Sequence, residues 1–583
     1  MLNKSCDILI IGGGGAALYA ALHAHDADPD LHVIVASKGL FGMSGCTRMV
    51  QGGYNVVLHP EDSFDMHYDD TLRGGGLLNN QELAWTLVTQ APERIFELEN
   101  RYGCYFDRLE DGSIHQRALA GQSFDRTVHR GDLTGIELMS RLSEQILLRD
   151  IEVLNEVRGV DLLLAGDGRT VCGALLRDFY SGELTILRAK SVLLATGGAA
   201  PLYNITAASL EKSGDGMAMA FRAGAEFVDM EMMQFHPTGL IVGDSVMIGT
   251  VLEEGLRGAG GHLLNALGER YMERYDPEKM ERSTRDRVAR SSFLEIRAGR
   301  GTTNNGVFLD VRHLGKEFLL KSSPGMYERC LSVGCDMAFD PIEVTPTAHF
   351  QMGGIRIDPD CRTSLQGLFA AGEDAGGVHG ANRLGGNGVA ESMVFGAIAG
   401  DAMASFAGEA SPVEPDADWT EEAVRRFAGS GKGDGANPFD LRERLGEVAW
   451  QHLGIIRSDE SLARAAQALT EIEAKLDDLT VAGPAAANHA LDQELDVENL
   501  LCVARLIRVA ASIRKESRGS HYREDFPNRD DDHFLVNFHL RRDRGGEPQV
   551  ESRAVRFSRR TPDDLKGETI IAESTARQLP AEA

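Results

Sequence analysis

The sequence predicts an α/β fold built around a doubly wound, mostly parallel sheet. Three short apolar runs, at residues 8–12, 33–36 and 191–196, have the length and composition of buried parallel strands. The first and the last run directly into glycines, which is typical of a strand that turns sharply at the edge of such a sheet. The strand-turn pattern returns at residues 367–388, and a helical pattern follows over 389–405.

The first turn carries the most information. Gly12, Gly14 and Ala17 have the spacing G-x-G-x-x-A between a strand and a helix. Because the turn lacks Cβ atoms, a pyrophosphate can approach the backbone amides of the helix N-terminus. Such a match alone also occurs in ordinary strand-helix units. The second strand ends at Ser37 and Lys38, where NAD-binding folds place an acidic residue on the ribose, and this weakens an NAD hypothesis.

Length and composition narrow the function classes. A chain of 583 residues is too long for one hydrophobic core, so several domains are expected. The net charge of −28 argues against nucleic acid and against anionic membrane surfaces as partners. The eight cysteines form no C-x-x-C pair, so neither an iron–sulfur cluster nor a structural zinc is indicated within the chain. No signal peptide and no run of about 18 apolar residues is present, so we expect a cytoplasmic chain that is not integral to a membrane.

The region between the first and last strand patterns mixes several kinds of structure. Residues 81–101 and 133–149 have the spacing of amphipathic helices, and 151–190 has the pattern of a β-meander. A further helix is predicted over 213–224. From about 236 to 344 the pattern is mixed and polar, with short strands and no strand-helix alternation, so we expect an inserted domain.

The last third of the chain reads as helical. Residues 408–440 contain SPVEPDAD and GSGKGDG, which is the composition of a flexible linker. Apolar stripes near 439–457, 460–479 and 495–516 predict three helices of a bundle. The tail beyond Phe534 contains one plausible strand.

Taken together, these stretches resemble the flavoprotein subunits of the succinate dehydrogenase and fumarate reductase family, which includes L-aspartate oxidase. The matching pieces keep the family's order and cover most of the chain. They are Gly12 to Ala17, Ser37-Lys38, QGG at 51–53, ATGG at 195–198, GDGMAMAFRAGA at 214–225, QFHPTG at 234–239, EGLRG at 254–258, TRD at 284–286, AHFQMGGI at 348–355, HGANRLGGN at 379–387 and KESRGSHYREDFPNRDD at 515–531.

The resemblance implies a doubly wound, Rossmann-like FAD-binding domain that is interrupted by an α+β capping domain. A helical bundle domain and a small C-terminal segment follow. The expected boundaries are 1–235 and 347–407 for the FAD-binding domain, 236–346 for the capping domain, 438–520 for the helical domain and 521–583 for the C-terminal segment.

The resemblance also implies FAD as the cofactor, with its pyrophosphate on the first helix and its isoalloxazine at the junction with the capping domain. Glu373 is similar to the family's acidic contact to the sugar-like chain of the flavin. The expected cofactor residues are Gly12, Gly14, Gly15, Ala16, Ala17, Ser37, Lys38, Gly45, Cys46, Thr47, Gln51, Gly52, Gly53, Thr196, Gly197, Asp215, Glu373, Asn387, Gly388 and Val389.

One departure concerns how FAD is held. Membrane-bound succinate dehydrogenases of the family carry a histidine, in the context S-H-T, that bonds covalently to FAD. Here the stretch reads Gly45-Cys46-Thr47, so a histidine link is impossible at this position. We expect non-covalent FAD, as in L-aspartate oxidase and the soluble fumarate reductases, with a cysteinyl thioether as the alternative. Loss of the link should lower the flavin potential and favour fumarate reduction or oxidase chemistry.

The resemblance places His236, His349 and Arg383 where the family binds substrate carboxylates. The chemistry suits these residue types, because a guanidinium can donate two parallel hydrogen bonds to one carboxylate. A lone histidine is more often structural. These two stand within HPTG and AHFQMGG, which favours a functional role.

Arg285 aligns with the arginine that donates or accepts the proton in the family. A guanidinium has a pKa above about 12, so this role needs a desolvated site and a relay. Glu254 and Arg257 match the family's relay, and their spacing of three places both on one helical face. A plain ion-pair network is the alternative interpretation.

Two further departures leave the substrate open. Glu253 stands where the family usually has a threonine that donates to a substrate carboxylate. Either Glu253 points away or is protonated, or Thr250 takes over, or the distal end of the substrate is not an anion. Leu119 replaces an aromatic residue of related pockets, so the site is expected to be roomier.

The leading hypothesis is an FAD-dependent oxidoreductase that interconverts a saturated and an α,β-unsaturated carboxylate by hydride transfer at flavin N5, most simply fumarate and succinate. The alternatives are an amino-acid oxidase similar to L-aspartate oxidase, an enzyme for a related carboxylate that is not a simple dicarboxylate, and a non-catalytic electron-transfer subunit. Without a cysteine cluster of its own, the chain must exchange electrons with a partner, a soluble donor or oxygen. The resemblance allows an iron–sulfur subunit, which would make the chain peripheral to the inner membrane.

Overall fold

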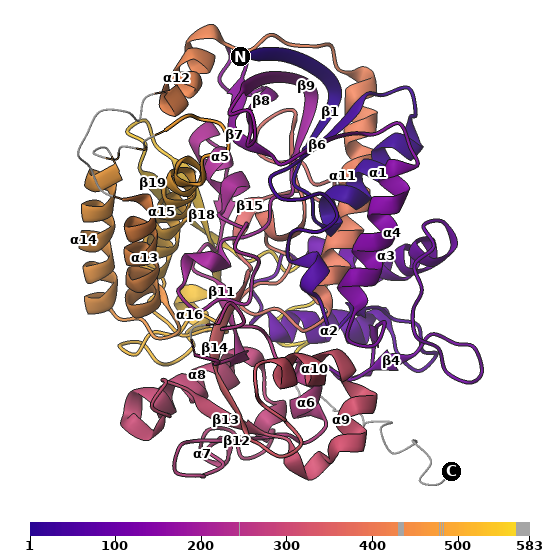
Figure 1. Cartoon of the computed structure of the whole chain (residues 1–583), viewed down its shortest axis with the longest axis vertical. Coiled ribbons are helices and arrows are strands. Elements are labelled where there is room, and N and C mark those ends of the chain that lie inside the picture. Colours follow the sequence, from indigo (N-terminus) through magenta and orange to yellow (C-terminus); the bar gives the residue numbers. More distant parts are fainter. Residues whose placement is uncertain (244, 429–436, 477–478, 480, 482, 567–583) are drawn as a thin grey trace.

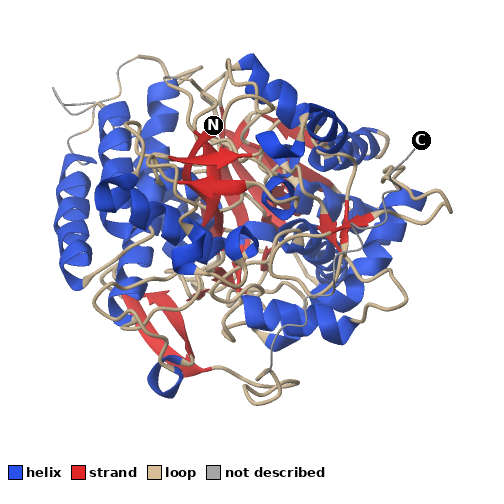
Figure 2. Ribbon diagram, turned by 90° about the horizontal axis from the view of Figure 1, so that it is seen from below, coloured by secondary structure: helices blue, strands red, loops and turns tan. Residues whose placement is uncertain are grey.

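The computed structural model describes residues 1–243, 245–428, 437–476, 479, 481 and 483–566, and it confirms the α/β fold class. Most strands lie in the middle of the molecule with helices around them, and one pair of strands lies at its lower-left edge (Figure 2). The central sheet has the order β6-β2-β1-β9-β8-β7, and β16 also pairs with β9. Its strands are β1 (Leu2–Ile11), β2 (Val33–Ser37), β6 (Glu152–Asn155), β7 (Val157–Leu164), β8 (Val171–Asp178), β9 (Leu184–Leu194) and β16 (Leu368–Ala370).

The parallel part of this sheet consists of β6, β2, β1, β9 and β16, and β7, β8 and β9 form an antiparallel meander. The predicted meander over 151–190 is therefore right for β7 to β9, whereas β6 joins the parallel part beside β2. The strand predicted at 191–196 is the end of the longer β9. The first half of β9 alternates between buried and half-buried residues, so only its fully buried end reads as a continuous apolar run.

One face of the central sheet is covered by α1 (Gly15–Ala27) and α11 (Asn387–Glu409), which pack against each other, with α3 (Gln81–Asn100) and α4 (Thr134–Leu147) beside them (Figure 1). Two glycines of α11 make this close packing possible. A Cβ at Gly396 would lie 2.8 Å from the Ala16 carbonyl oxygen, and one at Gly400 would overlap that of Ala20. Within the described residues, α11 is the one helix long and apolar enough to cross a membrane, with a mean hydropathy of 1.2, but it is a largely buried core helix here.

A second sheet, in the order β11-β14-β13-β12, carries its own hydrophobic core and lies at the lower end of the molecule in Figure 1. It corresponds to the mixed, polar region of the sequence. Its strands are β11 (Met233–Leu240), β12 (His262–Leu264), β13 (Val307–Asp310) and β14 (Ile342–Gln351). The helices beside it are α6 (Glu254–Gly258), α7 (Met272–Tyr275), α8 (Arg285–Glu295), α9 (Lys316–Ser322) and α10 (Pro324–Ser332). We refer to this unit as the cap.

The three predicted C-terminal helices are present as α13 (Pro438–Val448), α14 (Asp459–Leu476) and α15 (His489–Ile513). They pack against one another along the left side of Figure 1. α15 also contacts α5 (Asp215–Ala223), the helix predicted over 213–224.

Two predictions for the last third of the chain were wrong in part. The expected linker contains α12 (Ala417–Ala428), which is held on the sheet because Trp419 Nε1 donates to the Leu162 carbonyl oxygen at 2.9 Å. The polar, Pro-rich residues just before α12 are typical of a linker, so the sequence did not predict this helix. The GSGKGDG stretch lies outside the described residues. The tail contains two strands, β18 (Val536–Arg542) and β19 (Pro548–Ala554), instead of one, because β19 is largely exposed and lacks an apolar run.

The remaining short elements connect these units. β18 and β19 extend a third, small sheet in the order β17-β15-β10-β18-β19, and β3, β5 and β4 form a fourth, three-stranded sheet. These elements are α2 (Phe64–Gly74), β3 (Tyr54–Asn55), β4 (Gln116–Arg117), β5 (Thr127–Val128), β10 (Phe227–Val228), β15 (Gly354–Arg356), β17 (Ala375–Gly376) and α16 (Asp531–Phe534).

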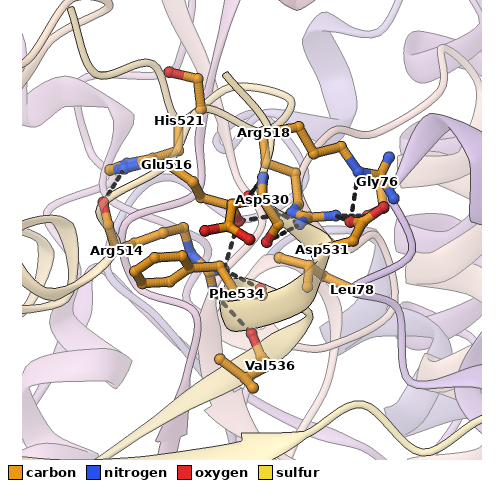
Figure 3. A network of polar contacts seen from close by, with 12 residues as sticks. Gly76, Leu78, Arg514, Glu516, Arg518, His521, Asp530, Asp531, Phe534 and Val536 are labelled. Atoms are coloured by element: carbon orange, nitrogen blue, oxygen red, sulfur yellow. Dashed lines mark hydrogen bonds and ion pairs between the residues drawn. The ribbon is translucent and has the colours of Figure 1, made fainter. Parts of the chain in front are cut away.

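A buried polar network fixes the segment after α15 onto the rest of the chain (Figure 3). Glu516 is fully buried and accepts hydrogen bonds from Arg514 at 3.1 Å and from Arg518 at 2.7 and 2.8 Å. Arg518 also donates to the Gly76 carbonyl oxygen at 2.9 Å, and Arg514 donates to that of Val536 at 3.0 Å. Glu516 thus links two buried guanidiniums that hold distant segments together, and each has a second carboxylate, Glu231 at 2.6 Å from Arg514 and Asp531 at 2.8 Å from Arg518.

We expect Glu516→Gln to lower the free energy of unfolding by about 1.5–3 kcal/mol, because the charge-assisted hydrogen bonds to Arg514 and Arg518 are lost while Glu231 and Asp531 still compensate the two cations. The measurement is the midpoint of thermal unfolding. Glu524→Gln is the matched control, since Glu524 forms an exposed pair with Arg297 whose loss should cost less than about 1 kcal/mol. Equal midpoints for the two variants would contradict the structural role of Glu516.

Candidate functional site

A cavity of about 600 Å³ lies where the carboxyl ends of β1, β2 and β9 meet the cap. This is the edge at which open α/β sheets bind ligands. Nearly all of the cofactor residues expected from the sequence line it, and so do His236, His349, Arg383, Glu253, Glu254, Arg285 and Leu119.

The turn after β1 forms one end of the cavity. Gly12 has φ +136°, and a Cβ there would overlap the Ala195 carbonyl oxygen at the end of β9. At Gly14, by contrast, the nearest atom to a Cβ is Thr47 Oγ1 at 3.6 Å, so this position is open. α1 begins here without a side-chain cap, although the Gly15 amide donates to Thr47 Oγ1 at 3.0 Å. The uncapped helix N-terminus suits the pyrophosphate of a dinucleotide.

Two expected cofactor residues do not reach this cavity. Ala17 is fully buried in the core under the turn. The expectation that Asn387 touches the cofactor needs correction for its side chain, which points away. Its Oδ1 accepts from Asn55 Nδ2 at 2.7 Å, and its Nδ2 donates to Thr71 Oγ1 at 3.1 Å. The side-chain amide of Asn387 thus holds the start of α11 through hydrogen bonds to buried residues that lie outside the cavity.

Asp215 and Glu373 line the cavity with carboxylates that already have partners. Asp215 Oδ1 accepts from Arg158 at 2.6 Å, and Lys38 Nζ lies 3.3 Å from Oδ2. Glu373 pairs with Lys212 at 2.6 Å and accepts from the Gln351 amide at 2.9 Å. Both carboxylates therefore orient neighbouring cations at the cavity wall.

The residues present fit FAD. The cavity begins at a helix N-terminus with an open glycine, and its wall includes a buried acceptor, Gln51 Oε1, that has no hydrogen-bond partner within the described residues. Buried polar atoms are rarely left unpaired, so this atom indicates a polar ligand.

We expect Gly14→Val to weaken FAD binding by at least about tenfold without unfolding the protein, because the new side chain projects into open space that the pyrophosphate needs. The ratio of FAD to protein after gel filtration measures the effect. Gly166→Ala, at a surface turn with no close neighbour, serves as the control and should retain full FAD content.

At the opposite end of the cavity, two arginines converge on one neutral oxygen. Arg285 donates to Gln234 Oε1 at 3.3 Å, and Arg383 donates to the same atom at 3.2 Å. Arg285, at the start of α8, also forms two hydrogen bonds to Glu254 Oε2, at 2.9 and 2.7 Å. Arg383 has no carboxylate partner within the described residues; its guanidinium stacks on the Phe350 ring at 4.3 Å, and its Nε is unpaired. The site therefore holds a buried positive charge that is not compensated.

This charge also governs the two histidines. The rings of His236 on β11 and His349 on β14 are 5.5 Å apart. Burial, and then the charge of Arg285 for His236 and of Arg383 for His349, holds both pKa values well below the usual range. Both rings are therefore neutral. Because the Thr238 amide donates to His236 Nδ1 at 3.3 Å, the hydrogen of His236 is on Nε2.

Burial and the nearby Arg285 lower the pKa of Arg383 to about 9. The shift reflects the free-energy cost of placing two cations side by side in a desolvated site. A bound anion would remove this cost. The arrangement is therefore suited to a carboxylate, with neutral imidazole donors beside it.

Glu254 connects Arg285 to Arg257. The second oxygen of Glu254 lies 3.3 Å from Arg257, and both residues are almost fully buried on α6, one turn apart as the spacing predicts. Burial raises the pKa of Glu254, but the charges of Arg285 and Arg257 more than offset it, so the pKa is lowered and the carboxylate stays ionised. Arg257 lies outside the first cavity and lines a second one of about 670 Å³, which Glu254 and Leu119 also border. Arg285, Glu254 and Arg257 thus form a row of charged groups that extends from the wall of the first cavity to the wall of the second.

Sequence reasoning missed two residues at this site. Gln234, which is shared by both arginines, stands inside QFHPTG but has no charge to attract attention. Arg117 pairs with Glu253 at 2.8 Å from the short strand β4, which carries no motif. Glu253 could have indicated that an arginine or lysine lies nearby, because a buried carboxylate needs a cation to compensate its charge.

Comparisons with known proteins find relatives over most of the chain. The family described as FAD binding domain matches residues 7–389, and the family described as fumarate reductase flavoprotein C-term matches residues 442–566. An uncharacterised FAD-dependent oxidoreductase of Methanocaldococcus jannaschii is 47% identical over 522 residues, which are 89% of this chain and 94% of the relative. A fumarate reductase (CoM/CoB) chain of Methanothermobacter marburgensis is 46% identical over 525 residues, which are 90% of this chain and 94% of the relative.

A solved structure agrees over a similar length. The FrdA chain of E. coli quinol fumarate reductase superimposes with a TM-score of 0.91 at 33% identity, covering 98% of this chain and 99% of that chain.

Proposed function

Because this chain belongs to the family of fumarate reductase and succinate dehydrogenase flavoproteins and is an FAD-dependent oxidoreductase of that type, we propose that it interconverts fumarate and succinate. The reductive direction is the one that the names of its relatives favour.

The observation that carries this proposal is the pair of guanidiniums on Gln234. Arg285 and Arg383 face one neutral amide oxygen at 3.3 and 3.2 Å in a buried wall, next to two neutral imidazoles. Only one of these two cations is compensated by a carboxylate, Glu254, within the described residues. A dicarboxylate supplies the missing negative charge and the acceptors for all four side chains.

Bound FAD supplies hydride chemistry at its N5 atom. The protein's own residues hold and polarise the substrate. Arg383 binds one carboxylate through its unpaired N–H groups, and His236 donates through Nε2. Arg285, which lies within hydrogen-bonding reach of the ionised Glu254, gives a proton to the neighbouring carbon and regains one through Glu254 and Arg257. Burial of this chain of groups prevents water from competing for the proton.

We also propose that FAD is held without a covalent bond. The Sγ atom of Cys46 accepts a hydrogen bond from the Ser209 amide at 3.3 Å, and burial raises the pKa of the thiol. A protonated thiol is a weak nucleophile. We expect acid precipitation to leave a colourless polypeptide and a yellow supernatant. Yellow colour retained on the polypeptide would contradict this and indicate a thioether at Cys46.

The proposed reaction also needs an electron partner. No group of His, Cys, Asp and Glu side chains suited to a metal ion occurs among the described residues, so electrons must be exchanged with another molecule. We propose an iron–sulfur subunit for this role, which would place the chain at the inner membrane only through its partners.

Two assays test the proposed reaction. Anaerobically reduced protein is mixed with fumarate, with crotonate and with no acid, and the recovery of oxidised flavin is followed. Oxidised protein is then incubated with L-aspartate in air, and peroxide is assayed. The proposal predicts fast reoxidation by fumarate and no peroxide. Peroxide formation without reoxidation by fumarate would identify an amino-acid oxidase instead.

A further inference from the structure

A buried ion pair between Arg117 and Glu253 forms part of the cavity wall near the substrate end. Glu253 is 4% exposed and lines the cavity, and its Oε1 lies 2.8 Å from a terminal nitrogen of Arg117. The same nitrogen donates to the carbonyl oxygens of Gln51 and Gly52 at 3.1 and 2.8 Å. The backbone therefore fixes Arg117, and Arg117 fixes the Glu253 carboxylate.

This carboxylate lies on the same wall as the arginine that we assign to proton transfer. Glu253 Oε1 and Leu119 Cδ1 are both 3.9 Å from the Cβ position of Gly52. Leu119 Cδ1 is also 3.0 Å from the Cβ position of Gly385, and this position lies 2.9 Å from Arg285. Leu119, Glu253 and Arg285 thus line the same cavity. A dicarboxylate held by the arginines brings negative charge into the cavity that Glu253 lines.

The charged groups that face Glu253 are Arg117 from β4, Asp132 from the turn before α4, Glu254 from α6 and Arg285 from α8. Burial has the largest effect and raises the pKa of Glu253. Arg117 offsets part of this increase, whereas Asp132 and Glu254 add to it. A dianion entering the cavity adds further like charge, which favours the protonated form still more.

We propose that Glu253 takes up one proton from solvent when a dianionic carboxylate binds, so that the Arg117–Glu253 pair sets the charge selectivity and pH dependence of substrate binding. The carboxylate and one proton give the carboxylic acid, and no other bond changes. Once protonated, Glu253 no longer repels the substrate. Arg117, released from its anion, adds to the positive charge that the substrate meets. This inference rests on the proposed function, since it assumes a dicarboxylate at Arg285 and Arg383.

The sign of the pH effect follows from linkage. The complex binds one proton more than the free protein at pH values between the pKa of Glu253 in the free protein and its higher pKa in the complex. Within this window, each increase of one pH unit weakens dianion binding by up to about tenfold. A monoanion whose uncharged end faces Glu253 does not require the proton and shows a flatter dependence.

Calorimetry of the oxidised, FAD-loaded protein tests this directly. Succinate and butyrate are titrated in buffers with different enthalpies of ionisation, which gives the number of protons taken up per ligand. The wild type is expected to take up close to one more proton with succinate than with butyrate. In Glu253→Gln this difference disappears, and succinate binding loses its dependence on pH.

Two further variants sharpen the test. Arg117→Gln removes the cation, so Glu253 is already protonated before succinate arrives, and proton uptake falls as well. Glu343→Gln removes a carboxylate of the cap outside both cavities and should behave as the wild type. His236 and His349 remain in all variants, so their protons do not contribute to the differences.

Proton uptake in Glu253→Gln that equals that of the wild type would overturn the inference while leaving the proposed function in place. A wild type that binds no dicarboxylate at all would overturn both.

Discussion

Replacing Arg285 by glutamine is expected to lower the turnover of fumarate reduction by about 10²–10⁴-fold, which is the usual contribution of a positioned proton donor. Arg285 donates to the buried Gln234 and to Glu254, with hydrogen bonds of 3.3 and 2.7 Å. Glutamine retains hydrogen-bonding capacity, but its neutral amide is a far weaker acid than a guanidinium and does not protonate carbon. FAD content should remain unchanged, because Arg285 lies on the cap at the far end of the cavity from the glycine turn.

Arg287→Gln is the matched control for this prediction. Arg287 stands on the same helix, α8, but its guanidinium is half-exposed and pairs with Asp276 at 2.9 Å outside the cofactor cavity. Single-turnover reoxidation by fumarate should be slow in Arg285→Gln and normal in Arg287→Gln. Normal rates in both variants would remove Arg285 from the proton path and leave the plain ion-pair interpretation of this network.

Replacing Arg383 by methionine is expected to weaken substrate binding by about 2–5 kcal/mol, so the KM for fumarate rises by roughly 30- to 5,000-fold. Arg383 is buried, has an unpaired Nε and has no carboxylate partner within the described residues. Its charge is therefore available to the substrate. Methionine keeps the contact with Phe350 and removes the charge.

The expected signature is a change in KM that exceeds the change in kcat, because Arg383 binds the substrate without transferring its proton. Arg356→Met, on β15 away from both cavities, is the control and should retain the wild-type KM. A variant at Arg383 with unchanged KM but reduced FAD content would instead assign this residue to the cofactor.

Much of the fold could be predicted because its signals are local. The strand, the G-x-G-x-x-A turn and the helix after it occupy consecutive residues, so one stretch specifies the end of β1, the open Gly14 and the start of α1. The three C-terminal helices were equally accessible, since apolar stripes repeat within each of them. By contrast, α12 follows a Pro-rich stretch and is held on the sheet by a contact of Trp419 that the sequence does not display. β19 is exposed and finds its place only through pairing with β18.

The candidate site shows the same division. His236, His349, Arg285 and Arg383 come from four separate motifs and line one cavity in the structure. The motifs did not indicate which side chains form hydrogen bonds or ion pairs with one another. Asn387 is adjacent to cavity residues in sequence, yet its amide faces inward, because the direction of a side chain at a helix start depends on tertiary packing. Arg117 became visible only when folding placed β4 beside Glu253.

The most direct test of the account is a single anaerobic turnover. Protein reduced to the flavin hydroquinone is mixed with one equivalent of fumarate, and oxidised flavin and succinate are both quantified. The account predicts that yellow colour returns fully and that one succinate forms per FAD, at a rate that collapses in Arg285→Gln. Flavin that stays reduced in the presence of fumarate, in protein with a full complement of FAD, would contradict it.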